Sequence, residues 1–148
     1  MSLNDWLADG TVKRQQVRAT EVARLREVAE RDLADAGIVG LSLDRRFATA
    51  YSAALQLATL VVRASGYRVA SSSSGHHWRT LSLLAELMGD SQRERTEYLD
   101  SCRRARNQAD YDRVGVVSDE EVDELVTEVS AFRADVEVWL ATNHPDLL

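Results

Sequence analysis

The stretch from Ser42 to Ser65 is predicted to be a helix that is apolar on nearly every side. Ser42 is a favourable N-cap, and Asp44 follows in the first turn, where a carboxylate complements the helix dipole. The apolar residues at helical spacing are Phe47, Ala50, Tyr51, Ala54, Leu55, Ala58, Val61 and Val62. Because such a helix needs several neighbours to cover it, the chain is expected to build a bundle around it.

Glycines mark the breaks between further helices, since glycine tolerates the positive φ found just past helix ends. The other predicted helices are Thr11–Ala36, Trp78–Met88, and two stretches that open at Ser91 and Ser118. The last two open with capping boxes, completed by Glu94 and Glu121. Strand-like alternation is absent, and Gly66–His77 reads as a surface loop. The expected fold class is all-α, an up-and-down bundle of four to five antiparallel helices.

Length and composition predict a single domain over residues 1–148, with residues 1–10 as a short N-terminal extension. The one cysteine, Cys102, excludes an intrachain disulfide framework, and its apolar neighbours indicate a buried thiol rather than a nucleophile. No apolar run reaches the length of a membrane span, and the N-terminus lacks a signal-peptide pattern. We therefore expect a cytoplasmic protein without a membrane partner.

Charge is distributed unevenly along the chain. The net charge of −6 argues against a protein that coats nucleic acid indiscriminately. Residues 45–85 nevertheless contain five arginines and no Asp or Glu, whereas residues 119–137 contain eight carboxylates and only Arg133. One pole could therefore attract a polyanion. The alternative is that these are solvated helix faces at opposite ends of the molecule.

Arg106 occupies an unusual place on its predicted helix. The apolar arc of that helix consists of Leu99, Cys102, Ala105 and Ala109. Arg106 falls inside this arc, where a guanidinium is costly unless it is paired or opens into a cleft. An i,i+4 ion pair with Asp110 would explain the spacing but not the arc, and Arg103, Asn107 and Tyr111 lie nearby. We expect Arg106 to serve function or an interface.

The histidines do not form a metal motif. His76 and His77 are adjacent, so they diverge on a helix, and His144 lies near the C-terminus. We therefore expect no metal and no cofactor. One of this pair could titrate near neutral pH or contact a phosphate, or it could be a polar helix-start residue without such a role. The common hydrolase and nucleotide-binding fingerprints are missing from the sequence.

Three segments together resemble the HEPN domains of bacteria and archaea, small helical bundles often encoded beside nucleotidyltransferases or other antitoxins. The segments are Ala29–Ala36, Phe47–Ala54 and Arg106–Asp112. His77 ahead of the third predicted helix and a last helix rich in valine and acidic residues are also similar. The likeness spans about residues 20–142.

The ribonuclease motif of this family is an arginine followed about four to six residues later by a histidine. Arg106 matches the arginine and Asn107 the polar residue often beside it, but Tyr111, Asp112 and Arg113 stand where the histidine is expected. Tyrosine is a poor base at pH 7 because its pKa is near 10. Whether the protein is an enzyme stays open, and only His77 could restore an imidazole.

The resemblance implies an RNA- or nucleotide-binding protein on the toxin side of a toxin–antitoxin or defence system, or an accessory component of one. A weak metal-independent ribonuclease is a further possibility. The candidate catalytic residues are Arg106, Asp110 and Tyr111, and the candidate phosphate-binding residues are Arg103, Asn107 and His77. The expected partners are a second copy of the chain, RNA or a nucleotide, and a cognate antitoxin or nucleotidyltransferase. The alternative is a non-catalytic dimeric interaction module in which the arginines hold the dimer together.

Overall fold

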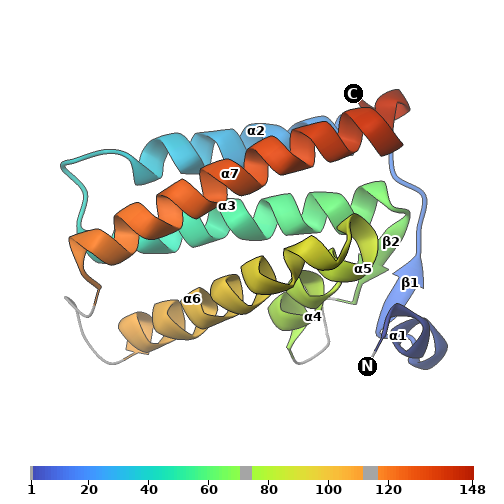
Figure 1. Ribbon diagram of the computed structural model, residues 1–148, viewed down its shortest axis with the longest axis horizontal. Coiled ribbons are helices and arrows are strands. Elements are labelled where there is room, and N and C mark those ends of the chain that lie inside the picture. The colour runs from blue at the N-terminus through green and yellow to red at the C-terminus, as the bar shows by residue number, and fades with distance from the viewer. Residues whose placement is uncertain (1, 71–74, 112–116) are drawn as a thin grey trace.

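The computed structural model describes residues 2–70, 75–111 and 117–148, with the side chains of 107–111 left out. Its elements, shown in Figure 1, are α1 (Leu3–Asp9), β1 (Val12–Arg14), α2 (Ala19–Ala36), α3 (Leu43–Ala64), β2 (Tyr67–Val69), α4 (His76–Ser82), α5 (Leu84–Met88), α6 (Arg93–Tyr111) and α7 (Asp119–Asn143). Short 3-10 turns cover Asp90–Gln92 and Pro145–Leu147. The predicted all-α class is confirmed, apart from one small sheet.

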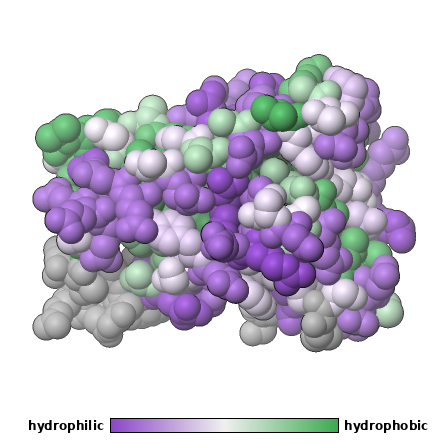
Figure 2. All heavy atoms as spheres, viewed as in Figure 1, coloured by the Kyte–Doolittle hydropathy of each residue, from purple (hydrophilic) through white to green (hydrophobic). Residues whose placement is uncertain are grey.

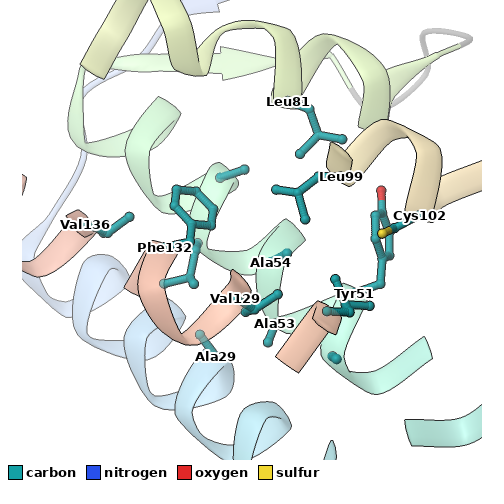
Figure 3. Packing of buried hydrophobic residues seen from close by; sticks show 14 of the residues in the cluster. Ala29, Tyr51, Ala53, Ala54, Leu81, Leu99, Cys102, Val129, Phe132 and Val136 are labelled. Carbon is teal, nitrogen blue, oxygen red and sulfur yellow. The ribbon is translucent and has the colours of Figure 1, made fainter. Parts of the chain in front are cut away.

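Helix α3 is the centre of the bundle. It packs against α2, α6 and α7 along its length and against α4 and α5 near its end. Tyr51, Ala54 and Leu60 of α3 are completely buried, and Phe132 of α7 and Leu99 of α6 join them in the core (Figure 3). The prediction of a central helix covered by several neighbours is therefore confirmed.

Of the three helix starts predicted with a capping serine, two are confirmed and one is wrong. The Ser42 hydroxyl caps α3 by accepting from the Arg45 backbone N–H, and Ser118 forms a capping box with Glu121 at the start of α7. Ser91 caps nothing, because a 3-10 turn occupies Asp90–Gln92 and α6 starts after it. The single helix predicted over Trp78–Met88 is also wrong, since α4 and α5 divide this stretch at Leu83.

The prediction that the chain lacks strands is wrong. Strands β1 and β2 pair antiparallel, with Val12 opposite Val69, Lys13 opposite Arg68 and Arg14 opposite Tyr67. As a consequence, the helix predicted from Thr11 begins only at Ala19, and the predicted loop contains β2. Three-residue strands are too short to show an alternating pattern, and their partners are more than fifty residues apart in the sequence.

The sheet is held in place by a second, smaller core. Trp6 of α1, Val12 of β1 and Val69 of β2 are buried against Val62 of α3 and Leu83. The residues expected as a short N-terminal extension thus include a helix that buries a tryptophan. Burial of this apolar surface stabilises a two-stranded sheet that would be marginal by itself.

Arg63 ties the sheet to the helices beneath it. Its side chain is 9% exposed and forms an ion pair with the Glu21 carboxylate of α2. The same guanidinium donates to the backbone carbonyls of Tyr67 at 3.0 Å, Gln16 at 3.3 Å and Gln15 at 3.4 Å. Arg63 is therefore a buried charge whose donors are met by protein acceptors.

Helix α3 is the one described helix long and apolar enough to cross a membrane. Within the bundle, 67% of its apolar window is buried, so its apolar character is that of a core helix. Figure 2 shows that the face in view is covered largely by hydrophilic side chains. Hydrophobic ones gather at the end where α2 and α3 are joined, and Ile38 and Val39 of that connection are exposed.

Candidate functional site

Three helices bring polar side chains to one place in the bundle. Helix α3 contributes Tyr51, α4 contributes His77, and α6 contributes Asp100, Arg103 and Arg106. We call these five residues the Arg106 cluster. The three residues from α6 are spaced three apart, so they follow one side of the helix. The packing of α4 and α6 on α3 makes the cluster possible.

Tyr51 is the floor of the Arg106 cluster. Its side chain is completely buried, and Cζ of Arg106 lies 5.5 Å from the centre of its ring, a cation–π contact. The His77 ring centroid lies 6.4 Å from that of Tyr51. In Figure 3, Tyr51 reaches from α3 toward α6, with its hydroxyl end beside Cys102. The prediction that Arg106 faces the apolar side of α6 is therefore confirmed, and its side chain is half-buried.

The hydroxyl of Tyr51 is buried and has no hydrogen-bond partner among the described residues. Burial raises the pKa of Tyr51 to about 12, although the nearby charges of Arg103 and Arg106 act in the opposite direction. The phenol therefore stays protonated near neutral pH and is no proton acceptor. In the Arg106 cluster, its ring packs against Arg106 and lies beside His77.

His77 is the titratable group that the cluster keeps neutral. Burial lowers the pKa of His77, and the neighbouring His76, Arg106 and Arg103 lower it further. The ring centroids of the two histidines are 5.6 Å apart. At pH 7 the imidazole is therefore neutral, the form that can accept a proton.

Asp100 is the acidic member of the cluster. It is buried, and its carboxylate accepts from Nε of Arg103 at 2.8 Å and from Nη1 of Arg104 at 2.6 Å. These charge-assisted bonds fix Arg103 in place. Residues 100–106 carry three arginines and one carboxylate, and this local surplus of positive charge favours an anionic ligand.

Of the residues singled out in the sequence, the structure brings together Arg103, Arg106 and His77. The side chains of Asn107, Asp110 and Tyr111 lie outside the described residues, so their roles remain predictions.

Sequence reasoning missed Tyr51 and Asp100 as site residues. Tyr51 looked like one more core residue of an apolar helix, and its phenol hydroxyl was the available signal. Asp100 has the ordinary i,i+3 and i,i+4 spacing of exposed ion pairs, and only its burial sets it apart. The packing of the helices determines that Tyr51 and Asp100 lie in the site.

Neither a metal group nor a reactive thiol stands out in the described part of the chain. No three His, Cys, Asp or Glu side chains gather there as metal ligands would. Cys102 is buried, and burial raises its pKa to about 11, so the thiol stays protonated. The interpretation of Cys102 as a buried hydrophobe is confirmed.

A family model described as HEPN-like matches residues 41–137. This range is more than half of the chain and contains all five residues of the Arg106 cluster, but it leaves out α1, β1, α2 and hence the segment Ala29–Ala36. Comparisons with curated proteins and with solved structures gave no match. The chain therefore belongs to the HEPN family of toxin-like helical domains related to nucleotides or RNA.

Proposed function

We propose that the Arg106 cluster binds RNA and that His77 acts as the base in its cleavage, on the toxin side of a toxin–antitoxin or related defence system. The observation that carries this proposal is that His77 of α4 and Arg106 of α6 both lie beside the Tyr51 ring, at 6.4 Å between ring centroids and 5.5 Å from Cζ to the ring centroid. The arginine motif of this chain has no histidine of its own. An imidazole from α4 supplies the missing chemical group.

Binding rests on the two arginines. A guanidinium can donate two parallel hydrogen bonds to one phosphate, which a lysine cannot do. Arg106 lies on the Tyr51 ring, and Arg103 is held by Asp100, so both are ordered before the ligand arrives. RNA is the expected substrate, and DNA is not, because the 2′-hydroxyl of RNA supplies a nucleophile for cleavage next to the bound phosphate.

Cleavage then requires one proton transfer and one displacement. Neutral His77 accepts the proton of the 2′-hydroxyl, and the 2′-oxygen attacks the adjacent phosphorus. The bond between phosphorus and the 5′-oxygen breaks, which leaves a 2′,3′-cyclic phosphate and a 5′-hydroxyl whose proton comes from water. Arg106 stabilises the negative charge that builds up on the phosphoryl oxygens. Tyr51 contacts no reacting atom and is a positioning residue.

The proposal includes a homodimer with α6 near the interface. Arg106 lies on the apolar side of α6, and a two-fold contact there would place a second Arg106 and a second His77 beside the first. Light scattering is expected to give the mass of a dimer at micromolar concentration. A monomer under these conditions would contradict this part of the proposal.

The test compares three variants with total RNA as the substrate. We expect His77→Gln to abolish cleavage and retain RNA binding, and Arg106→Ala to lose both. His144→Gln removes an imidazole at the end of α7 and is the matched control. The readouts are filter binding and the appearance of 2′,3′-cyclic phosphate ends, both in the presence of a chelator.

Cleavage by His77→Gln at the wild-type rate would refute the role of this histidine. If the wild type bound no RNA and Arg106→Ala dissociated a dimer, the result would favour the alternative of a non-catalytic interaction module.

A further inference from the structure

A second feature lies next to the Arg106 cluster, a cavity where β2 meets α3 and the first turn of α4. Its volume of about 350 Å³ is at the small end of the range for ligand pockets. The residues that matter here are Thr59 and Val62 of α3, Arg68 and Val69 of β2, His76 of α4, and Gln15 after β1. The two valines give the cavity an apolar wall against which a flat ring could pack.

The polar groups of the cavity differ in how many hydrogen bonds they already form with the protein. Arg63 lines one side, but Glu21 and three backbone carbonyls take up its donors. Among the described residues, the side chain of Arg68 has one hydrogen bond, a long one of 3.4 Å from its Nη1 to Oε1 of Gln15. Nδ1 of His76 is buried and has no hydrogen-bond partner in the described part of the chain. Arg68 is therefore the cationic group of the lining that a ligand could engage, and the buried Nδ1 of His76 is a polar atom that the described residues leave unsatisfied.

The sheet beside the cavity carries an unfavourable charge pair. Lys13 of β1 stands directly opposite Arg68 of β2, and both side chains are exposed. Like charges in a cross-strand pair destabilise a sheet, so this pair has an electrostatic cost. An anion bound at Arg68 would relieve the repulsion, and a phosphate matches the guanidinium in shape and charge.

His76 joins the cavity to the Arg106 cluster. Its ring lies 5.6 Å from that of His77, which in turn lies 6.4 Å from Tyr51, while its buried Nδ1 belongs to a residue that lines the cavity. A strand of RNA with one phosphate at Arg106 would therefore have its neighbouring nucleotide beside His76. Gln15 and Glu21 lie outside the range matched by the family model, so part of the cavity wall is added by this chain's own N-terminal segment.

We propose that this cavity is a subsite for one ribonucleotide, with the base against Val62 and Val69 and the phosphate on Arg68. The proposal rests on the proposed function, since it assigns the cavity to a nucleotide of the RNA bound at the Arg106 cluster. It gives the protein a means to select the base next to the cleaved bond.

The experiment titrates the full-length protein with the four ribonucleoside monophosphates, the four nucleosides and inorganic phosphate, by calorimetry. We expect one or more monophosphates to bind more tightly than either phosphate or the matching nucleoside. Arg68→Gln should weaken that binding about tenfold, since a hydrogen bond between charged groups is lost. Arg24→Gln is the matched control, because it removes the same charge from an exposed position of α2 outside the cavity lining and should change the affinity less than twofold.

A second variant, Thr59→Met, fills the cavity without a change in charge, and circular dichroism checks its fold. It too should weaken binding of the monophosphates about tenfold or more. Equal affinity for phosphate alone would overturn the proposal, and so would the lack of an effect of Arg68→Gln.

An RNA-binding measurement separates this proposal from the proposed function. If RNA binding depends on Arg106 but monophosphates do not bind, the cavity proposal fails and the proposed function stands. If monophosphates bind as expected and the wild type binds no RNA, the cavity is a nucleotide site and the proposed function fails.

Discussion

Arg63 and Arg106 are two arginines on the apolar faces of their helices, and their surroundings in the bundle differ. Arg63 of α3 meets the Glu21 carboxylate and the backbone carbonyls of three residues. Arg106 of α6 lies over the face of the Tyr51 ring, in a site where Arg103 adds positive charge. The first arrangement surrounds the guanidinium with oxygen acceptors, and the second sets it on an aromatic ring near a second guanidinium.

The comparison teaches that an arginine on the apolar face of a helix is not by itself a sign of function. What separates the two residues is the chemistry of their neighbours. A carboxylate and carbonyl oxygens compete with any incoming anion, whereas an aromatic ring and a second arginine favour one. Arg63 should therefore matter for stability and Arg106 for binding, and each prediction below tests this division.

The largest effect on stability is expected for Arg63→Met. The substitution leaves the Glu21 carboxylate and three carbonyls without their donor, and removal of one partner of a buried ion pair costs about 3–5 kcal/mol. Glu21 is 42% exposed and keeps part of its hydration, so we expect about 3 kcal/mol. Thermal unfolding should show a Tm lower by about 10 °C.

The control for this prediction is Arg93→Met. Arg93 forms an exposed ion pair with Asp90 at the start of α6, and such pairs contribute little. Its Tm should stay within about 2 °C of the wild type. Equal Tm values for the two variants would show that Arg63 does not hold the sheet in place.

The two arginines also show which features could be predicted from the sequence alone and which could not. The stretch Leu60–Ala64 places Arg63 among apolar residues, much as the helical wheel placed Arg106. Apart from the Tyr67 carbonyl, however, its acceptors come from residues around β1 and the start of α2, more than forty positions away. Since no local pattern encodes such pairing, Arg63 was not recognised and β1 was read as helix.

Local sequence signals were sufficient to predict features that depend only on residues close together in the chain. Ser42 and Ser118 cap their helices as predicted, because a cap depends on residues within one turn. The Arg106 cluster is intermediate, because one part of it could be predicted from the local sequence and another part could not. Arg106 could be predicted from the periodicity of one helix, but its neighbour Tyr51 depends on how α3 and α6 pack.

The second prediction concerns the floor of the Arg106 cluster. Tyr51→Leu removes a fully buried ring and should lower the free energy of unfolding by about 1–3 kcal/mol. Tyr51→Phe keeps the ring and removes a hydroxyl that has no hydrogen-bond partner among the described residues, so stability should hold or rise slightly. RNA binding should survive in Tyr51→Phe and weaken in Tyr51→Leu. Strong loss of binding in Tyr51→Phe would mean that the hydroxyl itself takes part.

The third prediction is a dependence of stability on pH that involves His77. Because the pKa of His77 is lowered in the folded protein, the unfolded chain binds a proton first as the pH falls. Stability should therefore decrease as the pH drops below about 6.5, the pKa of a free histidine, and level off below the folded pKa. Denaturant unfolding between pH 7.5 and 5 should show this slope in the wild type. The slope should be reduced in His77→Gln, and an unchanged slope would contradict the burial of this imidazole.

The smallest effect on stability is expected for Arg106→Ala, and this prediction completes the comparison with Arg63. Among the contacts with described residues, the variant loses a cation–π contact worth about 0.5–1 kcal/mol and also loses the repulsion between Arg106 and Arg103, and these two changes oppose each other. The free energy of unfolding should stay within about 1 kcal/mol of the wild type, while RNA binding falls tenfold or more. Arg106→Lys keeps the charge but not the planar fork, and its binding should be intermediate. A fall in Tm as large as that of Arg63→Met would make Arg106 a structural arginine as well, and the division drawn between the two residues would be wrong.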